Sequence, residues 1–337
     1  MPELRKDLIN EHWVALANGE ALKPNDFPIA RKRIVVQEEM ANCPFCAGKE
    51  TMTPQAIRVV SGSGQSWKMR VVPNKFTAFN LQGSLVAGDL GIYSYMNGLG
   101  SHEVLIETPD HYHEIQDYQL ADVRLYLEVL KERYMALAAD SRIKYIQIYK
   151  NRGMLAGATM THSHSQILGF PVVPNINPGG LSYYREHHHC LFCDLLLQDL
   201  NQPDRIIYQG EHFVLLCPYA ARYAYSAWLI PKMHIQHFHD FSENAMSELA
   251  ILLKCYIRAM LKVLNDCSYN VIMNTAPIEE GENSYHWCME INPRLSIASG
   301  VEIASGIYMN PVAPELAAVM LKEPFELELA AEMRGEN

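Results

Sequence analysis

The sequence has no uninterrupted apolar run of the length that a membrane span needs, about 20 residues. It also has no excess of basic residues, because 28 Lys and Arg against 38 Asp and Glu give a formal net charge of −10. A protein that binds duplex nucleic acid needs a basic surface, so we expect no nucleic acid among the partners. The N-terminal residues 1–7 lack the apolar core of a secretory signal. We therefore expect a cytoplasmic protein with no membrane partner.

Apolar residues suited to a folded core are abundant. Hydrophobic residues make up 49% of the chain and charged residues 20%, which is typical of a globular protein and not of a disordered one. A chain of 337 residues is long enough for two ordinary domains. Small anionic substrates stay possible, because a single pocket can be positive on an acidic protein.

Eight cysteines are present, and four of them form two C-x-x-C pairs, Cys43 with Cys46 and Cys190 with Cys193. In a reducing compartment this spacing favours metal binding over disulfides. The pairs lie 147 residues apart, too far for two halves of one zinc ribbon. Each pair therefore needs two further ligands of its own, and histidines would complete a tetrahedral site.

The order of predicted elements occurs twice along the chain. Each half has a strand, a turn with proline and histidine, a long helix, a second strand and another histidine. His234 follows His111 by 123 residues, and His286 follows His162 by 124. Such matched spacing indicates a duplication. We place the boundary near residues 174–180, which gives domains 1–177 and 178–337. The predicted elements are strands 103–107 and 145–149 with helix 120–139, then strands 226–230 and 269–273 with helix 243–264.

The duplication assigns the metal ligands. Two sets of two cysteines and two histidines result, and such closed sets suit structural zinc with no open position for catalysis. The other histidines have no counterpart at the matching offset in the same kind of turn. His113 is the strongest alternative ligand, because it lies two residues after His111. The predicted ligands are Cys43, Cys46, His111 and His162 in the first half, and Cys190, Cys193, His234 and His286 in the second.

The segment His162–Gln166 carries the sequence H-S-H-S-Q. If it is extended, its two histidines and its glutamine lie on one face, roughly 6.5–7 Å apart. By itself this pattern also fits a polar strand face with two exposed histidines. The second half keeps His286 but has Cys288 and Glu290 at the next two positions of the pattern. This asymmetry predicts that His162 is a metal ligand and that His164 and Gln166 take part in a reaction.

These motifs resemble those of the galactose-1-phosphate uridylyltransferase family, within the histidine-triad superfamily, over nearly the whole chain. The family pattern is H-P-H-x-Q, so Ser163 stands in place of a proline. The H-S-H-S-Q form and the second metal set look more like the plant-type ADP-glucose phosphorylase branch. The matching segments are 3–7 with Trp13, 43–46, 72–76, 109–111, Asn151, 162–166, 231–234 and 286–287.

The resemblance implies an α+β fold of duplicated histidine-triad-like halves, each an antiparallel sheet backed by a long helix. It implies transfer of a nucleoside monophosphate from a nucleotide sugar to a hexose 1-phosphate through a nucleotidyl-histidine at His164, assisted by Gln166. An ADP-glucose phosphorylase that uses inorganic phosphate is the alternative, followed by a zinc-stabilised binding protein without activity. A hydrolase would need a third histidine where Gln166 stands. The resemblance also implies a homodimer and substrate contacts from Asn74, Phe76, Asn151 and Thr159.

Overall fold

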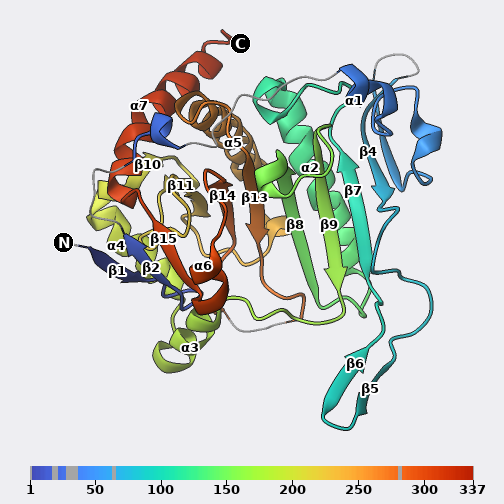
Figure 1. Ribbon diagram of the computed structural model, residues 1–337, viewed down its shortest axis with the longest axis horizontal. Coiled ribbons are helices and arrows are strands. Elements are labelled where there is room, and N and C mark those ends of the chain that lie inside the picture. The colour runs from blue at the N-terminus through green and yellow to red at the C-terminus, as the bar shows by residue number, and fades with distance from the viewer. Residues whose placement is uncertain (1, 17–21, 28–36, 63–65, 280–282, 337) are drawn as a thin grey trace.

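One antiparallel sheet of ten strands runs through the computed structural model, which describes residues 2–16, 22–27, 37–62, 66–279 and 283–336. The strand order is mirrored about its middle, so that five strands of the second half are followed by five of the first (Figure 1). In order across the sheet the strands are β10 (Ile206–Gln209), β11 (Phe213–Leu216), β12 (Ala227–Pro231), β14 (Cys288–Pro293), β13 (Tyr269–Asn274), β8 (Tyr145–Arg152), β9 (His164–Phe170), β7 (Ser101–Ile106), β4 (Trp67–Pro73) and β3 (Arg58–Ser61).

Strands β8 and β13 join the two halves at the centre of this sheet. They pair antiparallel, with Tyr149 opposite Ile272. Each strand would otherwise be the open edge of a five-stranded sheet, and the pairing satisfies the backbone groups of both. The α+β prediction with two similar halves is therefore confirmed, and the two sheets are continuous with each other. The domain limits 1–177 and 178–337 stay a prediction.

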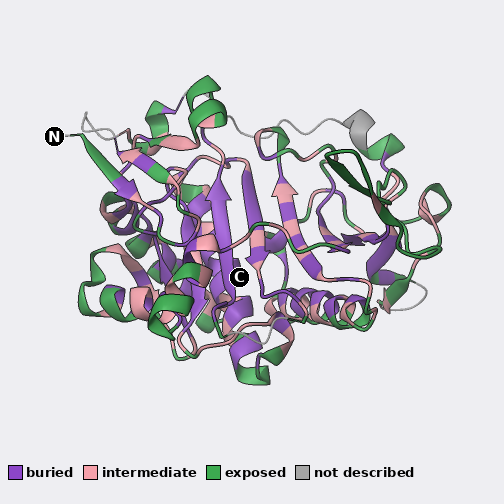
Figure 2. Ribbon diagram, turned by 90° about the horizontal axis from the view of Figure 1, so that it is seen from below, coloured by how far each residue is buried: buried purple, intermediate pink, exposed green. Residues whose placement is uncertain are grey.

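Two long helices cover one face of the sheet, as predicted. Helix α2 (Leu120–Ala138) lies behind the first half and α5 (Glu243–Val263) behind the second (Figure 1). Ser242 caps α5 by accepting a hydrogen bond from the Ala245 N–H at 3.2 Å. The apolar faces of both helices are buried against the strands in one large core, to which α7 (Pro314–Met333) adds by packing on α5 (Figure 2).

The remaining elements surround this core. A small sheet joins the N-terminal strands β1 (Glu3–Lys6) and β2 (Trp13–Leu16) to β15 (Ile307–Asn310). The hairpin of β5 (Ala87–Leu90) and β6 (Tyr93–Met96) projects from the body (Figure 1). The short helices are α1 (Gln37–Asn42), α3 (Pro178–His187), α4 (Leu191–Asn201), α6 (Gly300–Ser305) and the 3₁₀ turns η1 (Pro24–Asp26), η2 (Glu50–Met52), η3 (Ile115–Asp117), η4 (Met154–Ala156), η5 (Pro203–Arg205) and η6 (Phe238–Asp240).

Helix α3 begins at Pro178, so the end of the segment 174–180, where we expected the domain boundary, is helical. Proline suits the first turn of a helix because its missing N–H has no partner there anyway. Within the described residues, no helix is both long and apolar enough to cross a membrane.

Candidate active site

The side chains of His162–Gln166 alternate between the two faces of the sheet. Strand β9 begins only at His164, and His162 lies in the bend before it, so the strand starts later than predicted. The side chains nevertheless alternate between the two faces from His162 onward. The Ser165 hydroxyl reaches Tyr126 of α2 at 2.9 Å, on the helix-covered face, while Gln166 meets Tyr149 and His102 on the other. The two histidines and the glutamine therefore share the face away from the helices.

The first predicted metal set is assembled by the fold. Cys43 and Cys46 follow α1, His111 follows β7 and His162 precedes β9, and all four are buried. Their four ligand atoms lie within 4.8 Å of one another. The Cys43 Sγ is 3.6 Å from the His162 Nδ1, and the Cys46 Sγ is 3.4 Å from the His111 Nδ1 and 3.7 Å from that of His162.

These distances fit a tetrahedral zinc ion. Zinc bonds of about 2.3 Å to sulfur and about 2.0–2.1 Å to nitrogen give sulfur–nitrogen edges of about 3.6 Å. Burial lowers the pKa of His162 to about 4, which keeps its imidazole in the neutral form that binds metal. The other ring nitrogen of His162 donates to the Thr108 carbonyl at 2.8 Å, and that of His111 lies 3.1 Å from the Thr161 hydroxyl. Such outer hydrogen bonds fix the orientation of metal-binding imidazoles.

The second predicted set has the same geometry. Cys193 Sγ is 3.4 Å from the His234 Nδ1 and 3.6 Å from that of His286, and Cys190 Sγ is 4.0 Å from the latter. The four ligand atoms again lie within 4.8 Å of one another. The His286 Nε2 donates to the Pro231 carbonyl at 2.9 Å, as His162 does to its own carbonyl in the first half. Each half therefore contains a cluster able to hold a metal ion.

His164 is held so that one ring nitrogen is committed and the other is free for chemistry. Its Nδ1 lies 2.8 Å from the His162 carbonyl oxygen, which can only accept a hydrogen bond, so the proton is on Nδ1. Burial lowers the pKa of His164, so the ring is neutral near pH 7. Phe45, from the first C-x-x-C segment, packs edge-on against the ring at 5.5 Å. The Nε2 therefore carries a lone pair in a fixed direction, as a nucleophile requires.

The amide oxygen of Gln166 is surrounded by two polar groups. Tyr149 donates its hydroxyl to this oxygen at 3.0 Å, and the His102 Nε2 lies 2.7 Å from it. The Asn74 amide nitrogen is 3.0 Å from the same His102 nitrogen. With its oxygen so engaged, Gln166 has its amide N–H groups left to donate to a ligand. The contact between His102 and Gln166 was not predicted from the sequence.

The other predicted substrate-binding residues are more scattered. Asn74 joins the Gln166 group through His102, and its side-chain oxygen accepts from the Phe76 N–H at 2.9 Å. Phe76 is 88% exposed. Asn151 lies on β8 and accepts a hydrogen bond from Asn270 at 2.8 Å, while Thr159 is exposed in the loop before β9. Their contacts with a substrate stay a prediction.

The position in the second half that corresponds to His164 is filled by other side chains. Cys288, the counterpart of His164, is buried in an apolar cluster with Ile9 from the N-terminal segment and residues of α4. Glu290 forms an ion pair with Arg222 at 3.3 Å. A cavity of only about 60 Å³ remains there. At this position the second half therefore has a buried thiol in place of the histidine, and the cavity beside it is too small for a nucleotide.

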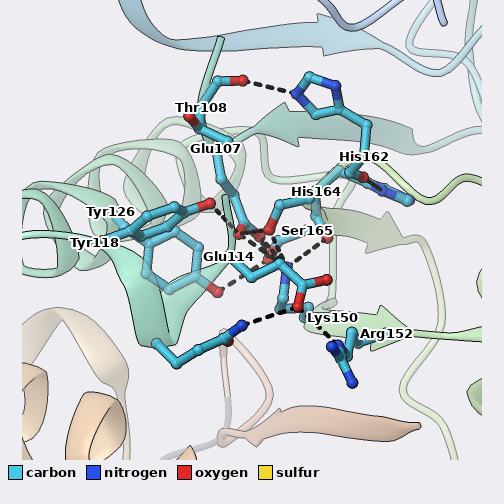
Figure 3. A network of polar contacts seen from close by, with 12 residues as sticks. Glu107, Thr108, Glu114, Tyr118, Tyr126, Lys150, Arg152, His162, His164 and Ser165 are labelled. Atoms are coloured by element: carbon cyan, nitrogen blue, oxygen red, sulfur yellow. Dashed lines mark hydrogen bonds and ion pairs between the residues drawn. The ribbon is translucent and has the colours of Figure 1, made fainter. Parts of the chain in front are cut away.

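A buried ion pair beneath β9 was not predicted. Glu107 and Lys150 are each 2% exposed, and the Lys150 ammonium lies 2.8 Å from the carboxylate (Figure 3). Ser163 and Ser165 also donate to this carboxylate, at 2.7 and 2.6 Å. In the sequence, the two serines that alternate with His162, His164 and Gln166 were the sign that polar side chains lie on this face.

Comparisons with known proteins agree with this geometry. The chain matches the galactose-1-phosphate uridyl transferase N-terminal domain over residues 11–174 and the C-terminal domain over 181–298. It is 34% identical to ADP-glucose phosphorylase of Arabidopsis thaliana, over 96% of this chain and 93% of the relative. It is 27% identical to galactose-1-phosphate uridylyltransferase of Thermotoga maritima, over 96% and 98%.

Solved structures resemble the fold over its full length. The crystal structure of the Arabidopsis thaliana ADP-glucose phosphorylase with bound ADP-glucose has a TM-score of 0.79 at 32% identity, covering 96% of this chain and 99% of that one. A uridylyltransferase structure at 22% identity has a TM-score of 0.72, covering 97% and 99%, and shows the shared fold. Two metal-ligand clusters, one H-x-H-x-Q segment and these matches lead to one conclusion: the chain belongs to the galactose-1-phosphate uridylyltransferase family.

Proposed function

We propose that this protein is a nucleotidyltransferase that moves a nucleoside monophosphate from a nucleotide sugar to a phosphate-bearing acceptor through His164. The observation that carries the proposal is the fixed tautomer of this ring, which leaves Nε2 free. In the uridylyltransferase type, the donor is UDP-glucose and the acceptor a hexose 1-phosphate. A zinc-stabilised binding protein without activity would have no use for this histidine or for its loss from the second half.

The transfer takes two displacement steps. The Nε2 of His164 attacks the α-phosphorus of the nucleotide sugar, a P–N bond forms, and the bond from that phosphorus to the bridging oxygen breaks. Sugar 1-phosphate leaves with the electron pair and needs no proton, because it is a good leaving group. A phosphate oxygen of the acceptor then attacks the same phosphorus and releases neutral His164, which gives ping-pong kinetics. The amide N–H of Gln166 donates to a non-bridging oxygen while negative charge is redistributed.

Zinc is the metal that the two clusters suit best, since each offers two thiolates and two imidazoles in a tetrahedral arrangement. Cys43, Cys46, His111 and His162 would hold one ion, and the second set would hold another. A closed set of four protein ligands supplies rigidity and not Lewis acidity. In this proposal the first ion anchors the chain directly before His164. Thiolate ligands require reduced cysteines, which supports a cytoplasmic location.

A second candidate is an ADP-glucose phosphorylase, in which inorganic phosphate accepts the adenylyl group and ADP is released. The 34% identity to the Arabidopsis thaliana enzyme and the H-S-H-S-Q sequence favour it. The two candidates share the same chemistry at His164. They differ in the nucleotide base and in the acceptor, and no described contact of this chain favours one base or one acceptor over the other.

One assay tests both candidates. UDP-glucose and ADP-glucose are supplied in parallel, each with galactose 1-phosphate or with inorganic phosphate, and labelled sugar 1-phosphate is followed for exchange into the nucleotide sugar. Exchange without an acceptor is expected for either candidate, because the first step is reversible. The productive pair of donor and acceptor then names the enzyme. Hydrolysis without exchange for every donor would contradict the proposal.

We also propose that the protein forms a homodimer, as the family resemblance implies, and that the β5–β6 hairpin lies in the interface. Leu90, Ile92, Tyr93 and Tyr95 of this hairpin are between 58% and 92% exposed, and the hairpin projects from the body (Figure 1). A two-stranded hairpin is marginally stable by itself, and an apolar patch of this kind marks an interaction surface.

Placing a charge at the tip of this hairpin tests the dimer. Ile92→Asp is expected to convert a dimer to a monomer, because burying an unpaired carboxylate in an interface is costly. Light scattering coupled to gel filtration measures the mass. Val319→Asp, on the exposed face of α7, is the matched control and should leave the mass unchanged. A wild-type protein that is monomeric at micromolar concentration would contradict the proposal.

A further inference from the structure

A buried polar network lies under the nucleophile strand, on the face opposite His164. Its centre is the Glu107 carboxylate, which accepts hydrogen bonds from Lys150 at 3.0 and 2.8 Å, from Ser163 at 2.7 Å and from Ser165 at 2.6 Å. Tyr118 also donates to it at 3.3 Å. The Lys150 ammonium has a further partner in the Ser163 hydroxyl at 2.8 Å. Figure 3 shows these groups around the carboxylate, and the rings of His162 and His164 lie outside this network.

The second half provides an internal comparison, because it has the same strands and helix but no nucleophile. The positions that correspond to the network are all apolar there and lie in the core between the sheet and α5. The strand and helix registers place each corresponding residue 123 or 124 positions further along the chain. The corresponding residues are Phe241 for Tyr118, Leu249 for Tyr126, Met273 for Lys150, Trp287 for Ser163 and Met289 for Ser165.

Glu107 itself is an extra residue in the first half. Ile106 pairs with His164, and Ile230 occupies the corresponding register beside β14, an offset of 124. Thr108 and Pro231 both supply the carbonyl that binds a metal-ligating histidine, an offset of 123. The first half therefore has one residue between these two points, Glu107, and the second half has none.

A buried ion pair of this kind is not needed for the fold. Apolar side chains fill the same layer in the second half, and replacement of buried ion pairs by apolar residues is often neutral or stabilising. The network has so far no part in the proposed chemistry, because it lies on the opposite face from the ring that would be nucleotidylated. Its presence in the half with the nucleophile, and its absence from the other, calls for a role connected to His164.

We propose that Glu107 and Lys150 are positioning residues that hold the His162–Gln166 segment, and through it the His164 ring, in the attacking orientation. The inference rests on the proposed function of His164. The Glu107 carboxylate binds the hydroxyls on both sides of His164, and its backbone N–H donates to the Ser163 carbonyl at 3.3 Å. Lys150 also lies 3.5 Å from the His164 carbonyl oxygen. The chain is thus held on both sides of the nucleophile.

Ser163 then has an explanation. A proline at this position restricts the backbone through its ring, because φ is fixed. A serine has no such restriction, and here its hydroxyl connects the backbone to a buried charge pair instead. The hydrogen bonds and the ion pair replace the stiffness of the ring. Both solutions limit the conformations of the residue between the metal ligand His162 and the nucleophile His164.

Three variants test this assignment in the intact, metal-loaded protein. Ser163→Ala keeps both charges and removes one connection, Glu107→Gln keeps the shape and removes the charge, and Lys254→Met is the control. Lys254 is 1% exposed and paired with Glu332 at 2.6 Å between α5 and α7, away from β9. Formation of the nucleotidyl-enzyme in a single turnover is measured by rapid quench, together with KM, metal content and Tm.

The first-turnover rate is expected to fall about 100-fold in Glu107→Gln and about 10-fold in Ser163→Ala, with KM changed less than threefold and metal content unchanged, because misplacement of a reacting group by about 1 Å costs that much. Lys254→Met should lower Tm and leave the rate within twofold of wild type. Rates within twofold of wild type in Ser163→Ala and in folded Glu107→Gln would overturn the assignment. If Glu107→Gln does not fold, the rate of Ser163→Ala alone decides the test.

A second measurement needs no substrate, so it separates this inference from the proposed function. In protein labelled with ¹⁵N-histidine, wild-type His164 is expected to give the signals of one tautomer with the proton on Nδ1. In Ser163→Ala and Glu107→Gln the two nitrogen shifts should move toward each other as the ring samples other orientations. An unchanged spectrum in both variants would overturn the positioning role. Absence of any nucleotidyl-enzyme in the wild type would instead contradict the proposed function alone.

Discussion

Replacing His164 by glycine is expected to lower the first-turnover rate by at least about 10⁴-fold, because removal of a covalent nucleophile leaves only the catalysis that binding and charge stabilisation supply. The ring is buried but lies outside the apolar core clusters, since its Nδ1 contacts the His162 carbonyl and the ring packs edge-on with Phe45. Folding and metal content should therefore change little. Rapid quench with labelled nucleotide sugar, followed by isolation of the labelled protein, measures the effect.

Free imidazole is the control for this variant. Glycine leaves a space the size of the missing ring, so added imidazole can enter it and accept the nucleotidyl group as a small molecule. Partial rescue by imidazole, with no label on the protein, is the expected result. Label that remains on the His164→Gly protein, in either half, would show that another residue is the nucleophile.

Loss of the first metal site should have the next largest effect. Cys43→Ser removes one of four buried ligands, and loss of a structural metal belongs to the changes that cost more than about 4 kcal/mol. At roughly 2–4 °C per kcal/mol, Tm should fall by about 10 °C. The first-turnover rate should fall about 100-fold as well, because His162 is a proposed ligand of this metal and its carbonyl also accepts the hydrogen bond that keeps the proton on the His164 Nδ1.

The duplication supplies the matched control for this prediction. Cys190→Ser removes the corresponding thiol of the second cluster, whose histidine His286 precedes Cys288 and not a nucleophile. A similar loss of Tm is expected with a rate within about threefold of wild type. Metal content by atomic absorption should fall by one ion per chain in each variant. Equal loss of activity in both would contradict a special connection between the first site and His164.

The metal clusters were predictable from the sequence because their ligands obey two short-range rules. Each cysteine pair has the C-x-x-C spacing, and each histidine recurs at a nearly constant offset in the other half. Together these rules identified all eight residues that the fold brings into two clusters. The alternation of a strand likewise placed His164 and Gln166 on the face of the metal ligand, even though β9 begins two residues later than expected. These properties depend on neighbours along the chain.

Contacts across strands could not be found in this way. His102 and Tyr149 meet Gln166 only because β7 and β8 flank β9 in a particular register, and nothing in their local sequence marks them. Glu107 looked like the last residue of an ordinary strand. Its separation from Lys150 is 43 residues, and only the ladder of hydrogen bonds puts the two charges 2.8 Å apart.

The sequence by itself determined the duplication and the residues of the two Cys/His clusters, since repeat spacing and residue type are properties of a linear chain. The tertiary structure alone decided that both halves share one sheet through β8 and β13. It also decided that the site in the second half is filled by Ile9 and α4, and that a buried charge pair lies beneath His164. The physical reason is that strand register and burial arise from long-range pairing, where a shift of one residue, such as the extra Glu107, changes which side chains face the core.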